Sequence, residues 1–180
     1  MKTVVLSLGL ALLCLLHVEA EDLGIAGLDK SKIAGKWYIT ATASESKSQF
    51  QKKEQRKMVK VAFKILETGD VKGTFSFSTP NGCKGSTAVF KETGIPGEYY
   101  SETGNKTVRV LNTDGETYAV IFASRVIDGK TSRMMKLYSR TPEVRPEIME
   151  LFKELSRQKG YTDDMINELI SHDECNIDEA

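Results

Sequence analysis

Few residues of this chain could carry out covalent catalysis. The 180-residue sequence has three cysteines and two histidines, and Cys14 and His17 both fall in a leading apolar stretch. Beyond it remain Cys83, Cys175 and a single histidine, His172. A nucleophile with a histidine base, or a zinc site built from several histidines, is therefore close to excluded by residue count. We predict no catalytic residue, no metal site and no cofactor, so the chain is not expected to be an enzyme.

The leading stretch has the form of a secretory signal. Lys2 precedes an apolar run over residues 4–16, and a small-x-small cleavage sequence ends at Ala20. The run is too short to span a bilayer, and no other long apolar stretch follows it. We expect residues 1–20 to be a signal peptide and residues 21–180 to form one secreted, extracellular domain without membrane insertion.

The two remaining cysteines would then be in an oxidising environment. A secreted chain with two cysteines usually pairs them, so a disulfide between Cys83 and Cys175 is expected. Closing so long a loop contributes roughly 4–5 kcal/mol in the chain-entropy model. The bridge would tie the middle of the chain to its tail and leave no free thiol.

The charge balance argues against polyanionic partners. The sequence has 25 basic and 25 acidic residues, and removing residues 1–20 leaves 25 − 1 = 24 of each. A neutral chain has no electrostatic footprint for nucleic acid or for an anionic membrane surface.

Non-covalent recognition has one candidate polar group at its centre. If Arg140 shares a strand face with Tyr138, then Lys136 and Met134 follow on that face. An unpaired ammonium inside a protein is costly. One hypothesis is that Lys136 or Tyr138 contacts a carboxylate, carbonyl or hydroxyl of a ligand. The alternatives are a bulge that turns the lysine outward, or an ion pair with a glutamate at 92, 98 or 102.

The elements that position these residues read as strands. Alternating apolar and polar residues, separated by turn sequences at hairpin spacing, predict eight strands between residues 35 and 140. Such a series indicates an up-and-down antiparallel barrel or a sandwich. A stripe of apolar residues at helical spacing then predicts a helix over about 146–159, packed on the outside. The tail, 160–180, is expected to contain a short further helix from Thr162. A polar loop at 44–56 is expected to lie over a binding site.

Alternation also predicts which side chains face inward. A closed eight-stranded barrel can enclose one small ligand, and small residues such as Gly73 and Ala41 would thin its wall. A filled core is the alternative. The predicted ligand-binding residues are Ile39, Ala41, Val59, Val61, Phe63, Val71, Phe75, Ala88, Phe90, Val108, Ile121, Ala123, Met134, Lys136 and Tyr138.

Several short motifs resemble those of the lipocalin family. Gly35-Lys36-Trp37 is similar to its Gly-x-Trp signature, and Thr113-Asp114 begins a turn similar to its second signature, with Gly115 where an aromatic residue is usual. Arg140 stands where the third signature has its arginine. The two cysteines, Cys83 and Cys175, are similarly placed to the family's common disulfide.

The resemblance implies an all-β fold, an eight-stranded up-and-down antiparallel barrel with one C-terminal α-helix, in which Arg140 lies across Trp37 at the closed end. It implies a secreted carrier of a small hydrophobic ligand of odorant, pheromone, fatty acid or retinoid type, with a homodimer as a further partner state. The alternatives are a protein-interaction lipocalin, such as a protease inhibitor or defence protein, and a calyx enzyme. Such an enzyme would need a reactive cysteine, which the expected disulfide removes.

One modification sequence is also present. Asn105-Lys106-Thr107 is an N-glycosylation acceptor sequence, located in a predicted turn of a secreted chain. The sequence leaves open whether it is used.

Overall fold

The structure is a computed structural model that describes residues 29–45 and 57–177. The predicted signal peptide and most of the polar loop predicted to cover the binding site lie outside the described residues. No described helix is long and apolar enough to cross a membrane.

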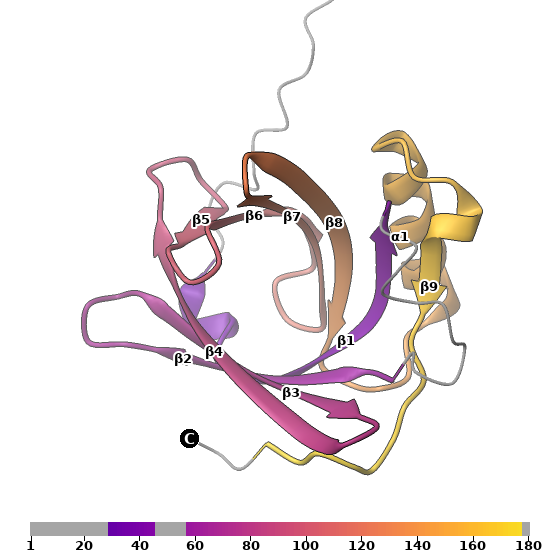
Figure 1. Ribbon diagram of the computed structural model, residues 1–180, viewed down its shortest axis with the longest axis horizontal. Coiled ribbons are helices and arrows are strands. Elements are labelled where there is room, and N and C mark those ends of the chain that lie inside the picture. The colour runs from indigo at the N-terminus through magenta and orange to yellow at the C-terminus, as the bar shows by residue number, and fades with distance from the viewer. Residues whose placement is uncertain (1–28, 46–56, 178–180) are drawn as a thin grey trace, which may run out of the picture.

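Eight antiparallel strands close into a barrel, which confirms the predicted fold class (Figure 1). Neighbouring strands are joined in sequence order from β2 to β8, and β1 closes the ring by pairing with both β8 and β2. The strands are β1 Gly35–Ser44, β2 Val59–Ile65, β3 Val71–Thr79, β4 Gly82–Glu92, β5 Glu98–Ser101, β6 Lys106–Thr113, β7 Tyr118–Ile127 and β8 Lys130–Ser139. Hairpin chemistry sets these bounds: the β7–β8 turn places Asp128 and Gly129 at φ 48° and 73°, as a tight two-residue turn requires.

A bulge in β1 reverses the faces of that strand. Ile39 pairs with Tyr138 and Ala41 pairs with Leu137, so Thr40 is an extra residue without a partner in β8. Because side chains alternate along a strand, one inserted residue moves every later side chain to the opposite face. Ala41, predicted to line the interior, therefore faces outward, and that prediction was wrong.

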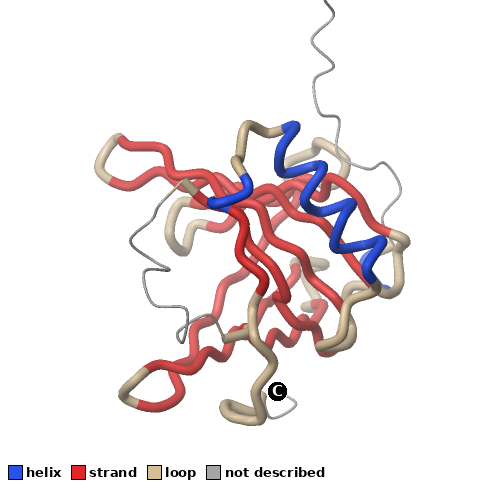
Figure 2. Tube along the Cα trace, turned by 90° about the vertical axis from the view of Figure 1, so that its right-hand side faces the viewer, coloured by secondary structure: helices blue, strands red, loops and turns tan. Residues whose placement is uncertain are grey.

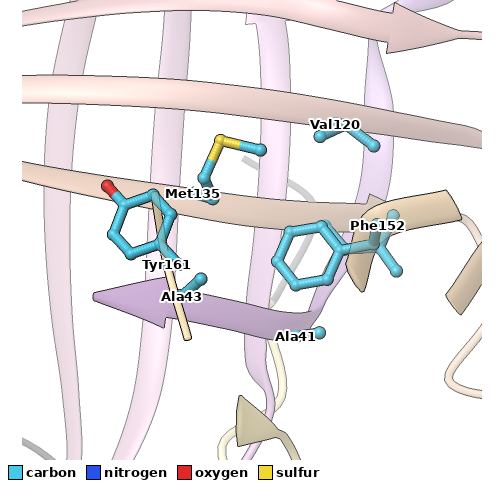
Figure 3. Close-up of a cluster of buried hydrophobic side chains, with 7 residues drawn as sticks. Ala41, Ala43, Val120, Met135, Phe152 and Tyr161 are labelled. Atoms are coloured by element: carbon cyan, nitrogen blue, oxygen red, sulfur yellow. The ribbon is translucent and has the colours of Figure 1, made fainter. Parts of the chain in front are cut away.

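The outward face of β1 and β8 is covered by the helix α1, Pro146–Gln158 (Figure 2). Pro146 occupies the first helical position, where the missing N–H costs nothing. Phe152 is fully buried from the helix side, and Tyr161 follows just beyond the helix end. Figure 3 shows the cluster they form on the outside of the barrel. Its buried members are Ala41, Ala43, Val120, Met135, Leu137, Phe152 and Tyr161.

The short helix predicted from Thr162 is not what forms. A single 3-10 turn, η4 (Asp163–Met165), leads into a ninth strand, β9 (Ile166–Glu168), which pairs antiparallel with residues 41–43 of β1. The pairing of β1 with β2 ends at Ile39, which leaves the next backbone groups of β1 unpaired on that side. The tail pairs with this edge, because unpaired N–H and C=O groups at the edge of a strand form hydrogen bonds with an added strand.

Candidate ligand-binding cavity

Trp37 and Arg140 form the closed end of the barrel, as predicted. The guanidinium carbon of Arg140 lies 4.0 Å from the indole centroid. Arg140 also donates to the backbone carbonyls of Lys36 at 2.9 Å and Lys32 at 2.6 Å. Gly35 gives the arginine room, since a Cβ there would lie 3.2 Å from Nη1. The cation–π contact and the carbonyl bonds together fix η1 (Lys30–Lys32) across the barrel floor.

The turn that starts at Thr113 braces the same end. Asp114 accepts from the backbone N–H groups of Glu116, Thr117 and Tyr118. Burial raises the pKa of the Asp114 carboxyl, but these donors and the Thr117 hydroxyl outweigh it and lower the pKa to about 2. Gly115 replaces the usual aromatic residue because it sits at φ 82°, a backbone conformation that side chains disfavour.

The disulfide between Cys83 and Cys175 is formed, with Cα atoms 5.3 Å apart and a sequence separation of 92. It fixes the tail against the β3–β4 hairpin. Glu174, one residue earlier, accepts from the Lys57 ammonium and the Ser78 hydroxyl, both at 2.7 Å. Tail and barrel mouth therefore form one cross-linked unit.

The barrel is hollow, and its interior divides into two compartments. The compartment nearer the closed end is narrow and almost wholly apolar. Its lining comprises Lys32, Ile33, Trp37, Phe63, Val71, Phe90, Tyr99, Val108, Val110, Thr113, Gly115, Ala119, Ile121 and Tyr138. The interior of the barrel therefore contains a cavity and is not a filled core.

The compartment at the open end is wider, with a volume of about 910 Å³, and mixes polar with apolar side chains. Its lining comprises Ile39, Thr42, Lys57, Val59, Phe75, Phe77, Ser78, Ser86, Thr87, Ala88, Thr103, Gly104, Lys106, Ala123, Ser124, Arg125, Ile127, Ser132, Met134, Lys136 and Leu169. No acidic residue is among these described lining residues, whereas four are cationic, and of these four Lys57 is paired with Glu174. The electrostatic character of this compartment favours an anion.

Aromatic rings lie where the two compartments meet. Phe63 and Phe75 pack edge to face with centroids 6.2 Å apart, and Phe63 also lies 6.0 Å from Tyr138. Gly73 makes room for the first pair, since a Cβ at Gly73 would lie 3.0 Å from each phenylalanine ring. The prediction that Gly73 thins the wall is therefore corrected: aromatic rings fill the space that it leaves.

Lys136 points inward at this junction. Of the three glutamates named as alternative partners, Glu92 pairs with Lys30, Glu98 with Arg109, and Glu102 approaches Lys91. The bulge that could have turned Lys136 outward lies in β1 instead. No acidic residue in the described part of the chain pairs with Lys136, so its ammonium faces the cavity without a counter-ion.

A second lysine, Lys106, faces the same cavity. Its Nζ lies 5.2 Å from the Phe90 centroid and 5.8 Å from that of Phe75. Burial, and secondarily the charge of Arg125, lower the pKa of Lys106. Burial, and secondarily the charge of Lys106, lower the pKa of Lys136 to about 8. Both ammonium groups therefore lack the solvation and counter-charge that they would have in water.

Each lysine has an unpaired hydroxyl across the strand pair. Thr42 stands opposite Lys136, and Ser101 stands opposite Lys106. The hydroxyl oxygens of Thr42 and Ser101 are buried and have no hydrogen-bond partner among the described residues. Buried hydroxyls are normally satisfied. Thr42 lines the wide compartment beside Lys136, so its hydroxyl marks a place where a polar ligand atom would fit, whereas Ser101 lines neither compartment.

Every residue predicted to bind ligand lines one of the compartments, except Ala41 and Val61. Val61 does face the interior, but Trp37, Ile39 and neighbouring side chains cover it completely. The role of the lining residues as ligand contacts stays a prediction.

Sequence reasoning missed several lining residues, of which Lys106 matters most. Its position was detectable, because Lys106 lies two residues before Val108, which was placed on the inward face. The inward direction of Thr42 could not be predicted, because it results from the bulge in β1 and the alternation of residue types does not reveal a bulge. Lys57 precedes β2, where no strand pattern assigns its direction.

The described residues contain no group of three or more His, Cys, Asp or Glu side chains that could hold a metal ion. The two cysteines of the described chain are joined in the disulfide. What the cavity offers is an apolar compartment, a cationic junction and a wider mouth, which suits non-covalent binding of an amphipathic anion.

Comparison with known proteins agrees with this geometry. The family model described as the lipocalin / cytosolic fatty-acid binding protein family matches residues 34–173. The chain is 47% identical to an extracellular fatty acid-binding protein of Gallus gallus and 45% identical to that of Coturnix japonica, covering 100% of each protein. It is 30% identical to lipocalin-1 of Sus scrofa over 92% of both chains.

Two solved structures are similar over most of the chain. One, the siderocalin Ex-FABP, is described as functioning through dual ligand specificities. It is 42% identical, with a TM-score of 0.76 over 83% of this chain and 97% of that one. The other, siderocalin Q83, is described as revealing a dual ligand binding mode. It is 41% identical, with a TM-score of 0.74 over 84% of this chain and 98% of that one.

Proposed function

Because the chain belongs to the lipocalin family, we propose that it carries a long-chain fatty acid, with the carboxylate at Lys136 and Lys106 and the acyl chain in the narrow compartment. The protein is an extracellular lipocalin and a binding protein rather than an enzyme, as its avian relatives are. Among the ligand types that the sequence suggested, their names support the fatty acid and give no specific support to odorants or pheromones.

The observation that carries the proposal is the pair of cavity lysines, Lys136 and Lys106, for which the part of the chain that the structure describes supplies no counter-ion. Two ammonium groups that repel one another inside the barrel are unfavourable until an anion binds. A carboxylate placed between Lys136 and Lys106 would supply the missing charge, and the Thr42 hydroxyl, which lines the same compartment, could donate to it. Hydrogen bonds to charged groups contribute about 1.5–3 kcal/mol, so losing one lysine should weaken binding about 10- to 100-fold.

The apolar compartment would hold the acyl chain. Each buried methylene contributes about 0.8 kcal/mol, so each added carbon should tighten binding about fourfold until the compartment is filled. Phe63, Phe90 and Tyr138 form the walls along which the first carbons would lie. With the acyl chain in the narrow compartment, most of the wide compartment would remain free.

A second ligand is supported by that wide compartment. Arg125 and the two junction lysines line it without an acidic residue in the described lining, and its volume of about 910 Å³ exceeds what the polar end of a fatty acid needs. Both similar solved structures are described with dual ligands. We propose a bulky anion of the siderophore type, an iron(III) chelate, as the second cargo.

The deciding experiment is a fluorescence titration of delipidated protein at pH 7 with a conjugated polyene fatty acid, and then with the alcohol of the same chain. We expect wild type to prefer the acid, and Lys136→Met to bind acid and alcohol about equally. Lys64→Met is the matched control, since Lys64 is exposed on the outside of β2.

Equal affinity of the wild type for acid and alcohol would refute the carboxylate position, and failure to bind either would refute the carrier proposal. For the second ligand, an iron(III) catecholate chelate should bind protein already saturated with fatty acid, and Arg125→Ala should weaken the chelate more than the fatty acid. Mutual displacement of the two ligands would show one shared site instead.

A further inference from the structure

We propose that Asn105 carries an N-linked glycan, and that its first sugar lies on the outer wall of the barrel against the ring of Tyr100. The acceptor sequence Asn105-Lys106-Thr107 occupies the turn between β5 and β6 and the start of β6 (Figure 1). As an extracellular protein, the chain passes the compartment in which such sequences are modified. The ligand-binding function plays no part in this inference.

The backbone of the turn is fixed independently of the Asn105 side chain. The Asn105 N–H donates to the carbonyl of Glu102 at 3.1 Å, and its carbonyl accepts from the N–H of Val126 at 3.2 Å. Asn105 has φ 46°, a conformation that asparagine tolerates better than most residues. A sugar on the side chain would therefore disturb no bond that holds the hairpin.

The side-chain amide presents the correct atom to solvent. Asn105 is exposed, and its Oδ1 accepts from the Tyr100 hydroxyl at 3.2 Å. The Nδ2 atom, to which the sugar is joined, has no hydrogen-bond partner among the described residues. The glycosidic amide keeps its carbonyl oxygen, so the bond from Tyr100 can persist in the glycosylated protein.

Strand alternation sends the glycan away from the ligand. Lys106 points into the barrel, where it lines the wide compartment. Thr107, the next strand residue, therefore points outward, because successive residues of a strand face opposite sides. Asn105 precedes the strand in the turn, and its side chain is held on the same outer side by the hydrogen bond from the Tyr100 hydroxyl. Thr107 stands opposite Tyr100 in the β5–β6 pair, so both acceptor residues flank one partly exposed aromatic ring. That ring offers the first sugar an apolar surface beside a hydroxyl.

The first test is the intact mass of full-length protein secreted by cultured eukaryotic cells, before and after treatment with peptide N-glycosidase. We expect a glycan mass that the enzyme removes, leaving aspartate at position 105. It should be absent in Asn105→Gln and Thr107→Val but present in Thr107→Ser. An unmodified mass in secreted wild-type protein would overturn the proposal.

The position of the glycan has its own test. Removing the sugar should lower the melting temperature of wild type and of Tyr100→Phe, which keeps the ring, but should leave that of Tyr100→Ala unchanged. Affinity for a polyene fatty acid should be the same with and without the glycan. An equal loss in all three proteins would refute the contact with Tyr100, and altered affinity would refute its place on the outer wall.

Discussion

Lys136 should make the ligand-free protein less stable at neutral pH, and Lys136→Met should relieve that cost. The folded-state pKa of Lys136 is lowered to about 8 from the 10.5 of an ordinary lysine, by burial first and by Lys106 second. Between these two values the unfolded chain binds more protons than the folded protein does. Stability contributed by this group therefore rises as the pH rises from about 8 to 10.5, and the full cost applies below pH 8.

The magnitude follows from that shift. A difference of about 2.5 pH units corresponds to about 3 kcal/mol, at 1.36 kcal/mol per unit. Water in the hollow barrel reaches the half-buried side chain and screens part of this, so we expect about 2 kcal/mol. Methionine fills a similar volume without charge. For a domain of this size, Lys136→Met should raise the melting temperature by about 4–8 °C.

The assay is urea unfolding of delipidated protein at several pH values between 6 and 10.5, with the disulfide intact. Delipidation matters because a bound anion would neutralise the lysine and hide the effect. Lys64→Met is again the control and should alter the free energy of unfolding by less than about 0.5 kcal/mol. The advantage of Lys136→Met should shrink steadily above pH 8.

Two results would refute the reasoning. Lys136→Met could be no more stable than wild type at pH 7, which would mean that the ammonium is adequately solvated. Alternatively, its advantage could persist unchanged to pH 10.5, which would mean that packing rather than charge produces it. Either outcome would also weaken the argument that Lys136 binds an anionic ligand.

Further predictions concern the frame of the barrel. Gly73→Ala should cost about 1–3 kcal/mol in urea unfolding, because the new Cβ would overlap two phenylalanine rings, and an unchanged midpoint would contradict this. Asp114→Asn should cost about 1 kcal/mol at pH 7 after allowance for solvent screening. Because the folded pKa of Asp114 is about 2, below the ordinary 3.8, that difference should vanish as the pH falls from about 4 to 2, and a pH-independent difference would exclude the carboxylate. Replacing Cys83 and Cys175 together with serine should cost about 4–5 kcal/mol, measured as the loss in the free energy of unfolding, with little change in fatty acid affinity.

Local chemistry made most of the barrel predictable from the sequence. Alternation identified the inward faces of β2, β3, β4 and β8 because these strands pair in unbroken register with β3, β4 and β7 between recognisable turns. The contact of Arg140 with Trp37 could be expected only from the resemblance, since no pattern along the chain reports a contact between residues so far apart.

The wrong predictions share one physical origin. At each of these places two arrangements compete for the same residues, and the local sequence does not show which of them has the lower free energy. Thr40 forms a bulge because β1 must pair with β8 while its other edge passes from β2 to β9. The segment after Thr162 carries helical spacing, yet an unpaired strand edge offers it more hydrogen bonds. Position 73 is a glycine because the rings of Phe63 and Phe75 occupy the space that a side chain would need. The spacing of residues along the sequence cannot distinguish this from a gap in the barrel wall.

The interior combines features that a stable core would avoid. Within residues 29–45 and 57–177, Lys136 and Lys106 lack counter-ions, and the hydroxyls of Thr42 and Ser101, which stand opposite them, lack hydrogen-bond partners. A sequence selected for stability alone would place apolar residues there, because such groups cost free energy when unpaired. An anionic ligand offsets this cost only when it is bound. The destabilisation of the ligand-free barrel is therefore relieved on binding and adds to the affinity for the ligand. The same argument explains why the closed end is so heavily braced by Arg140: the frame must tolerate an unfavourable interior while the barrel is empty.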